Sequence, residues 1–264
     1  MLVILKGLTR VALMIGVGLV FAPAHSLRAS AFHVTPIRVD FDRNTTSTVM
    51  TLVNESTEEL RFQISVASWQ QDKQGQMQLS PTDDIVFFPA LLTLKAGEER
   101  KVRVGRTVAP TDVEKTYRIS FEELPPLQKV GAPPQGSQVK IITKMSIPIF
   151  VVPDNRKTAA EIVGPAVRNG KLTFDLKNNG NVHYMAQAVR VIGMGEGNQA
   201  VFDRQRQGWY ILSGETRTFD MELKPEECAK VKSIRLEVRT DLTEVPETST
   251  LKKDIDMPSA ACGH

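Results

Sequence analysis

Few residues of this sequence have the type and spacing that catalysis needs. The candidates for a general acid or base are the three histidines after residue 31, His33, His183 and His264, and the carboxylate pairs Asp83-Asp84 and Glu122-Glu123. His183 follows a turn, so we expect it at the surface or at the start of a strand, and Asp83-Asp84 in a solvated loop. The sequence contains no nucleophile elbow, HExxH motif or glycine-rich phosphate loop. It therefore predicts a protein that is not an enzyme and that needs no metal ion or cofactor.

Cys228 and Cys262 are the two cysteines of the chain. Their spacing matches neither a CxxC redox motif nor a Cys/His zinc site. An exported protein can oxidise such a pair to a disulfide that closes the carboxyl-terminal tail. Two free thiols are the alternative.

The amino terminus predicts export. Two basic residues precede the apolar run Val11–Phe21, and small residues follow it. This order is typical of a secretory signal peptide covering 1–31, cleaved after Ala31 or, as a second choice, after Ala24. An uncleaved anchor is the alternative, although the run is shorter than the ~20 residues of a membrane span.

Removal of 1–31 also changes the charge of the chain. The full sequence has 33 Lys and Arg against 30 Asp and Glu. The signal peptide contains Lys6, Arg10 and Arg28 and no acidic residue, so the mature chain is neutral. A neutral chain gives no reason to expect nucleic acid or a membrane surface as a partner.

The elements that must position any functional residue are β-strands. Apolar residues alternate with polar ones in short runs, and turn residues separate the runs. The clearest runs are Phe62–Val66, Val102–Val104, Tyr117–Phe121, Leu172–Leu176 and Ile234–Val238. Short strands punctuated so often predict an all-β protein with two immunoglobulin-like β-sandwich domains. We place these domains at 32–153 and 160–257, with a tail at 258–264.

One run, Val139–Val151, is more than twice as long as the ~5–6 residues of a typical strand. Pro148 cannot donate a ladder hydrogen bond, so this part of the run should lie at an edge or a bulge. Two interpretations remain open. The apolar face belongs entirely to the core, or its first half is offered to another polypeptide, because exposed apolar edges recruit other chains. The Pro-, Gly- and Gln-rich segment 125–138 before it favours the second interpretation.

An ordered set of motifs identifies the family that this chain resembles. The chain is similar to the PapD-like periplasmic chaperones of pilus assembly, and to their divergent archaic branch in particular. Phe32–Val39 resembles their first strand, Val139–Pro153 their subunit-capping strand, and Tyr117–Pro125 their motif aromatic-x-aliphatic-x-aliphatic-x-Glu-aliphatic-Pro. In the second half, 179–183 and 208–214 resemble the archaic branch.

The resemblance implies a mechanism, a compartment and partners. Pilin subunits of that system lack their last strand, and the chaperone supplies one by β-strand addition in the periplasm. The implied subunit-binding residues are Val139, Ile141, Thr143 and Met145. An outer-membrane usher would receive the subunit, and a self-capped dimer of the chaperone is a further possible partner state.

The resemblance also implies an anchor for the carboxylate at the subunit's carboxyl terminus. In the family this anchor is an Arg and a Lys in the cleft between the domains. Arg38 occupies the Arg position, but Pro148 stands where the Lys should be. Arg118 is the first candidate to replace the Lys, and Lys144 is a weaker one. For Arg38 and Arg118 the alternative is a solvated arginine on a strand.

The second function class that fits the sequence is an exported two-domain immunoglobulin-like binding or adhesion protein. Trp69, Trp209 and Tyr210 could stack on sugars in such a protein. Both tryptophans lie in strand-like runs, so packing in a core is the expected role for each of them.

Overall fold

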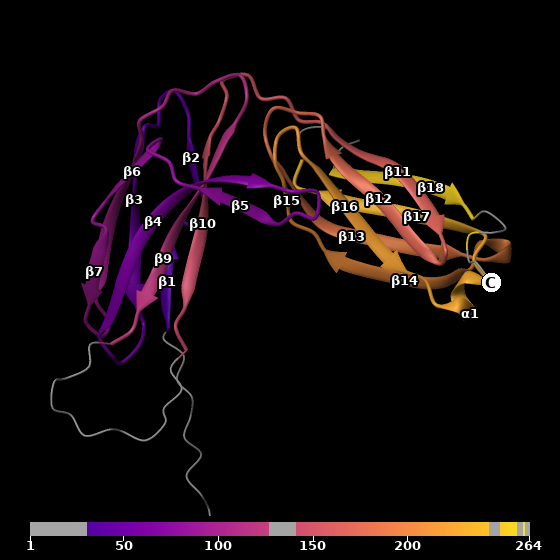
Figure 1. Cartoon of the computed structure of the whole chain (residues 1–264), viewed down its shortest axis with the longest axis horizontal. Coiled ribbons are helices and arrows are strands. Elements are labelled where there is room, and N and C mark those ends of the chain that lie inside the picture. Colours follow the sequence, from indigo (N-terminus) through magenta and orange to yellow (C-terminus); the bar gives the residue numbers. More distant parts are fainter. Residues whose placement is uncertain (1–30, 127–140, 243–248, 258–260, 262–264) are drawn as a thin grey trace, which may run out of the picture.

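The computed structural model describes residues 31–126, 141–242, 249–257 and 261. Within them, strands form four sheets that are arranged as two sandwiches set at an angle to one another (Figure 1). The predicted all-β fold with two immunoglobulin-like domains is therefore confirmed. The predicted signal peptide, Val139 with most of the loop before it, and the tail residues Cys262 and His264 lie outside the described residues. In the described part, no helix is long and apolar enough to cross a membrane.

The first sandwich contains strands β1 to β10. One sheet has the order β1-β3-β8-β6, and the other has the order β2-β10-β9-β4-β5 with β7 paired to β4. The strands are β1 (Phe32–Thr35), β2 (Val39–Phe41), β3 (Ser47–Asn54), β4 (Leu60–Gln71), β5 (Met77–Ser80), β6 (Ile85–Phe88), β7 (Leu91–Leu94), β8 (Glu99–Arg106), β9 (Lys115–Leu124) and β10 (Lys144–Val151).

The second sandwich contains strands β11 to β18. A three-stranded sheet, β11-β12-β16, faces a five-stranded sheet, β14-β13-β17-β18 with β15 paired to β13. The elements are β11 (Ala160–Arg168), β12 (Lys171–Asn178), β13 (Tyr184–Met194), η1 (Glu196–Asn198), β14 (Ala200–Gln207), β15 (Tyr210–Ile211), β16 (Thr216–Glu222), α1 (Pro225–Cys228), β17 (Ser233–Thr240) and β18 (Thr250–Asp256). The exact limits given above for the two domains stay a prediction.

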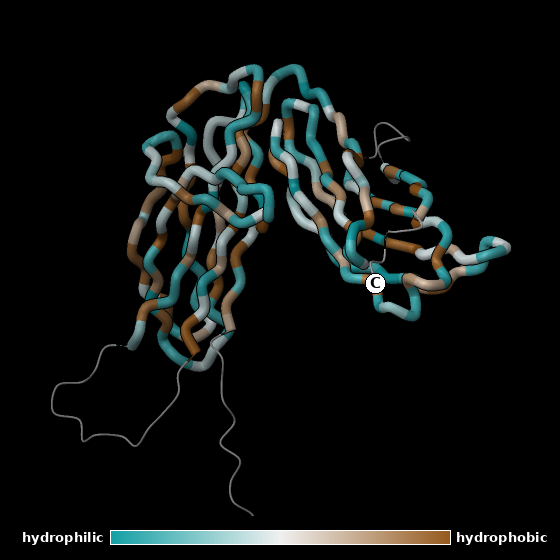
Figure 2. The backbone as a smooth tube through the Cα atoms, turned by 45° about the vertical axis from the view of Figure 1, so that its right-hand side comes forward, coloured by the Kyte–Doolittle hydropathy of each residue, from teal (hydrophilic) through white to brown (hydrophobic). Residues whose placement is uncertain are grey.

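The alternation of apolar and polar residues along the strands determines which side chains form the two cores. On β9, Tyr117, Ile119 and Phe121 point into the space between the two sheets of the first sandwich and are buried. Each large apolar side chain buried in this way contributes roughly 1.5–3 kcal/mol. Figure 2 shows the consequence along the chain, where hydrophobic residues lie on the strands and the turns are mainly hydrophilic.

The structure also shows the positions of Asp84 and Cys228, for which expectations follow from the sequence. Asp84 lies in the predicted loop, but it is not simply solvated, because it accepts a hydrogen bond of 2.6 Å from the Tyr117 hydroxyl. Cys228, at the end of α1, is buried and disulfide-bonded. The alternative of two free thiols is therefore wrong for Cys228.

The predicted long strand is shorter in the structure. β10 begins at Lys144, and 141–143 have no strand conformation. Glu123 and Leu124 of β9 lie opposite Thr143 and Ile142, but among the described residues the ladder beyond Lys144 keeps only the bond from the Glu123 N–H to the Thr143 carbonyl. On the other side of β10, β2 pairs only with Ile149–Val151. The prediction that Val139–Val151 is one strand is therefore wrong for Ile141–Thr143.

Candidate functional site at the edge of β10 and the domain interface

The first half of β10 has a neighbour on one side only. β9 pairs with it from Lys144 to Val151, whereas β2 reaches only Ile149. Among the described residues, the outer edge of Lys144–Pro148 therefore has no strand beside it. This is the edge position that Pro148 predicted.

The register shows which backbone groups of β10 face outward. Glu123 donates its N–H to the carbonyl of Thr143 at 3.0 Å, so these two residues form a hydrogen-bonded pair. In an antiparallel ladder such pairs alternate. The N–H groups of Met145 and Ile147 consequently face β9, and those of Lys144 and Ser146 face the open edge. Pro148 lies at an outward-facing position, so its missing N–H costs no bond to β9.

The side chains predicted to bind a subunit lie at the start of this edge. Ile141 is 49% exposed, and its neighbour Ile142 is 46% exposed. Met145 is partly buried against the core of the first sandwich. Thr143 precedes the strand, and Val139 is outside the described residues.

An aromatic cluster joins the two domains beside the other end of β10. Trp69 and Phe150 of the first domain pack with Tyr210 of the second, and Val152 and Leu212 complete this buried group. The Trp69 and Tyr210 rings meet edge to face with centroids 5.6 Å apart. The core role expected for Trp69 is thus confirmed, but that expected for Trp209 is wrong, because Trp209 is 39% exposed.

Arg118 lies beneath this cluster on the outer face of β9. Only 5% of the residue is exposed, and its guanidinium lies 4.9 Å from the centre of the Trp69 ring. Nε donates to Ser146 Oγ at 3.1 Å and Nη2 donates to the Ser146 carbonyl at 2.6 Å. Nη1 is buried with no hydrogen-bond partner among the described residues. Burial lowers the pKa of Arg118, yet an arginine remains charged in a protein. A buried cation with a free donor is suited to an anionic ligand.

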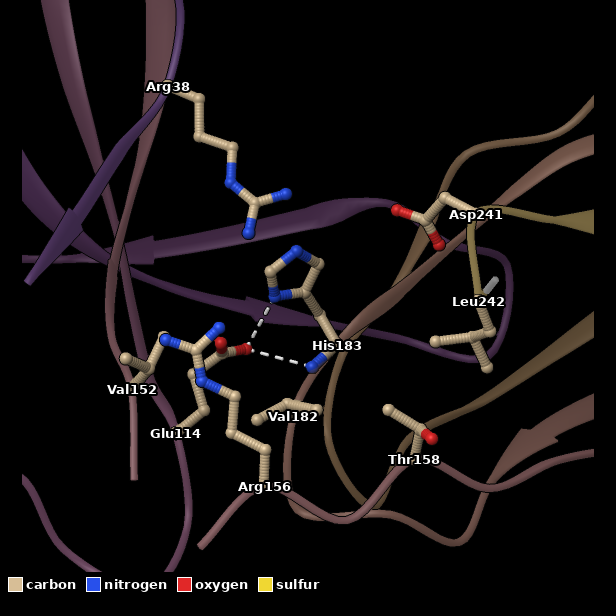
Figure 3. Close-up of a pocket in the computed structure, with 9 residues that line it drawn as sticks. All are labelled: Arg38, Glu114, Val152, Arg156, Thr158, Val182, His183, Asp241 and Leu242. Atoms are coloured by element: carbon tan, nitrogen blue, oxygen red, sulfur yellow. Dashed lines mark hydrogen bonds and ion pairs between the residues drawn. The ribbon is translucent and has the colours of Figure 1, made fainter. Parts of the chain in front are cut away.

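Arg38 approaches the same region from the chain just before β2. Its guanidinium lies 4.9 Å from the centre of the Phe150 ring, and its Nε donates to both carboxylate oxygens of Asp40 at 3.0 and 2.9 Å. Figure 3 shows the guanidinium pointing into a pocket between the domains, which has a volume of about 220 Å³. Both Arg38 and Arg118 act electrostatically on the Tyr210 hydroxyl, whose pKa is raised by burial and lowered in part by these two cations.

His183 forms the floor of this pocket with Glu114, and sequence reasoning missed the pair. The imidazole Nδ1 lies 2.7 Å from Glu114 Oε2, and the backbone N–H of His183 donates to the same oxygen at 2.9 Å (Figure 3). The ring stacks on Phe150 at 3.8 Å. His183 is at the start of β13 as expected, but the expected surface position is wrong because both side chains are buried. The two residues are 69 apart in sequence, so no local pattern could have paired them.

Lys144 lies away from the two arginines. Its ammonium forms an exposed ion pair of 2.8 Å with Glu122. It is six residues from Phe150 along β10, which corresponds to roughly 20 Å at ~3.3 Å per residue. The structure therefore brings Arg38 and Arg118 to the domain interface and leaves Lys144 at the far end of the strand.

The sequence comparison that decides the family concerns the first domain. Residues 31–157 match the family of pili and flagellar-assembly chaperones, PapD N-terminal domain. The first domain belongs to the PapD-like family of chaperones. Comparison with curated protein sequences yields no relative.

Solved structures show that the fold of this PapD-like protein extends over both domains. The SafB chaperone in complex with the SafA pilin of Salmonella enterica is 16% identical, with 87% of this chain and 98% of that chain covered and a TM-score of 0.54. The class 5 fimbriae chaperone CfaA is 16% identical, with coverages of 86% and 100% and a TM-score of 0.51. A CsuC–CsuE chaperone–tip subunit complex from the archaic Csu pili of Acinetobacter baumannii is 23% identical, with coverages of 72% and 90% and a TM-score of 0.51. Such low identities bear on the fold alone, so membership of the archaic branch stays a prediction.

Proposed function

We propose that this PapD-like protein is a periplasmic chaperone that binds pilin subunits by strand donation and delivers them for pilus assembly. The observation that carries the proposal is the open outer edge of Lys144–Pro148 in β10. An open edge beside a sandwich core can complete the sheet of a partner that lacks a strand. The subunit's apolar groove would then be shielded from aggregation until assembly.

The backbone of the edge supplies the affinity in this proposal. The outward N–H groups of Lys144 and Ser146 can pair with a subunit strand, whereas the Ser146 carbonyl is already bound by Arg118. The side chains supply the specificity, with Ile141, Thr143 and Met145, and Val139 before them, filling alternate pockets of the subunit groove.

The two arginines supply the anchor. We assign the subunit's terminal carboxylate to the space between Arg38 and Arg118, where Nη1 of Arg118 lacks a partner among the described residues. The terminal nitrogens of Arg38 can donate to the ligand, because Asp40 accepts hydrogen bonds only from Nε of Arg38. Lys144 is too distant along β10 to take part.

The partner class is supported by what the similar structures contain. Two of them are complexes of a chaperone with a pilin or a tip subunit. Delivery of this chain's subunit to an outer-membrane usher, and pairing of the open edge with a second copy when no subunit is present, belong to the same proposal.

A pair of neighbouring substitutions tests strand donation. The chain is co-expressed with candidate pilin subunits, and the amount of subunit that co-purifies is measured. Ile141→Asp places an unpaired carboxylate in the subunit's apolar groove and should cost roughly 3 kcal/mol or more, which is over ~100-fold in affinity. Ile142→Asp is the matched control, because Ile142 is almost equally exposed and would face away from the subunit groove if the segment pairs as a strand, where successive side chains point to opposite faces.

The expected result is loss of subunit with Ile141→Asp and recovery of subunit with Ile142→Asp, while both variants remain folded. Full recovery with Ile141→Asp would overturn the proposal.

A further inference from the structure

The hairpin of β4 and β5, residues 68–80, reaches from the first domain onto the second. Figure 1 shows the tip of this hairpin, between β4 and β5, extending toward β15 and β16. Every second residue from Trp69 to Gly75 contacts the second domain, beginning with the Trp69 ring on Tyr210. The residues concerned are Trp69, Gln71, Lys73 and Gly75.

Gln71 makes the second contact, and both the nitrogen and the oxygen of its side-chain amide form hydrogen bonds. Nε2 donates to the Tyr210 carbonyl at 3.0 Å, and Oε1 accepts the Leu212 N–H at 3.1 Å. The residue is buried, so loss of either bond would leave an unsatisfied polar group at the interface. Gln71 thereby holds the β15 segment in place against β4.

The tip of the hairpin makes the remaining contacts, on β16. The Lys73 carbonyl accepts the Thr218 N–H at 2.7 Å. Gly75 lies against the guanidinium of Arg217 so closely that a Cβ on Gly75 would come within 2.6 Å of Arg217 Nε. The same guanidinium lies 5.0 Å from the centre of the Phe219 ring, which is buried in the second core.

The turn at the tip is itself well ordered by hydrogen bonds. Asp72 Oδ1 accepts the N–H groups of Gln74 and Gln76 at 3.0 and 2.8 Å, and the Asp72 carbonyl accepts the Gly75 N–H at 2.8 Å. Gly75 has φ of 77°, a conformation that favours glycine. A tip fixed in this way can transmit a constraint between domains, whereas a flexible loop cannot.

We propose that the β4–β5 hairpin is a brace that fixes the angle between the two domains. A first contact region lies at the interdomain connection, where Glu114 bonds His183 and the Asn181 amide donates to Asp112 and Asn155. That region alone would permit rotation about it. The hairpin adds a second region on β15 and β16, and two separated contacts hold two rigid bodies in one orientation.

The consequence for the site rests on the function proposed above. Arg38 lines the same pocket as Glu114 and His183 of the first region, and Arg118 lies against the Trp69 ring of the hairpin. Both cations act on Tyr210, which the hairpin holds through Gln71. The brace therefore positions the second domain against the two cations and keeps the carboxylate site formed before a subunit arrives. Trp69, Gln71 and Gly75 are positioning residues in this account.

The test compares two glycines with the same backbone conformation. Gly75→Val places a side chain against Arg217, whereas Gly97→Val is the control, since Gly97 has φ of 72° and nothing within 4 Å of its added Cβ. Spin labels are attached after Lys101→Cys and Lys252→Cys, two exposed positions on β8 and β18. Distances between them are measured by pulsed electron resonance on the free chain.

The expected result is a single narrow distance distribution for the parent chain and for Gly97→Val, and a shifted or broader one for Gly75→Val. In the Arg217→Ala background the valine should have a smaller effect, because its steric partner is gone and only the backbone strain at Gly75 remains. Gln71→Ala, which breaks two buried interdomain bonds without strain in the turn, should also broaden the distribution.

An unchanged distribution in both Gly75→Val and Gln71→Ala would overturn the brace, as would equal broadening in Gly97→Val. Since no subunit is present, this outcome is independent of strand donation. A brace confirmed in a chain that binds no pilin would leave the inference standing and the proposed function refuted.

Discussion

Arg118 has a side chain that is charged, buried and only partly bonded. Its position on β9 could be predicted from the alternation of Tyr117–Phe121, but its burial could not, because the second domain and the Trp69 ring that cover it come from distant parts of the chain. The same limit explains why the burial of His183, expected at the surface or at the start of a strand, was not predicted. Local patterns report which face of a strand is apolar, and they do not report what a second domain later covers.

The first prediction at this scale concerns the anchor. Arg118→Ala and Arg38→Ala should each weaken pilin binding by roughly 2–5 kcal/mol, the cost of removing one partner of a buried charge pair. Lys144→Ala should bind normally, because its ammonium is exposed and paired with Glu122. Titration calorimetry with a purified subunit measures all three. Normal binding by both arginine variants would contradict the assignment.

The second prediction concerns Asp42, whose carboxylate accepts the N–H groups of Asn44 and Thr45. These bonds hold the pKa of Asp42 below its ordinary 3.8. A lowered folded-state pKa stabilises the fold above the unfolded-state value, and this contribution is lost as pH falls through the folded-state value. Asp42→Asn should therefore lower the Tm at pH 7, and the gap to the parent chain should shrink as pH falls below 3.8. A gap that stays constant with pH would count against this explanation.

At the scale of elements, alternation predicted the strands well and their ends poorly. The runs Phe62–Val66 and Ile234–Val238 lie within β4 and β17, where both flanking partners exist. The start of β10 depends instead on how far its hydrogen-bonded ladder with β9 continues, which the β10 sequence does not contain. The sequence also did not predict that the β4–β5 hairpin extends beyond its own sandwich, because the residues at its tip have the composition of an ordinary turn.

A proline pair tests the register of β10. Lys144→Pro removes an outward N–H and should leave the Tm nearly unchanged, although it should weaken subunit binding. Met145→Pro removes an N–H that faces β9 and leaves a carbonyl of that strand unpaired, at a cost of roughly 1–3 kcal/mol. Thermal unfolding and subunit co-purification of the two variants provide the measurement. Equal loss of stability in both would show that the assigned register is wrong.

At the scale of the whole molecule, a buried aromatic group makes the two sandwiches one unit. Phe150 is fully buried between Trp69, Tyr210 and the stacked His183 ring. Phe150→Ala should cost roughly 3–5 kcal/mol and should separate one calorimetric unfolding transition into two. Phe174→Ala, in the second core, should lower stability without separating the domains. Two transitions already present in the parent chain would contradict this coupling.

Strand donation depends most on the open edge of β10, and amide hydrogen exchange tests the state of this edge directly. Exchange is measured at Lys144, Met145, Ser146 and Ile147, with and without a bound pilin subunit. We expect the outward amides of Lys144 and Ser146 to exchange quickly in the free monomer and to become protected in the complex, while Met145 and Ile147 are protected in both. Unchanged exchange at Lys144 and Ser146 in a stable complex would contradict strand donation by β10.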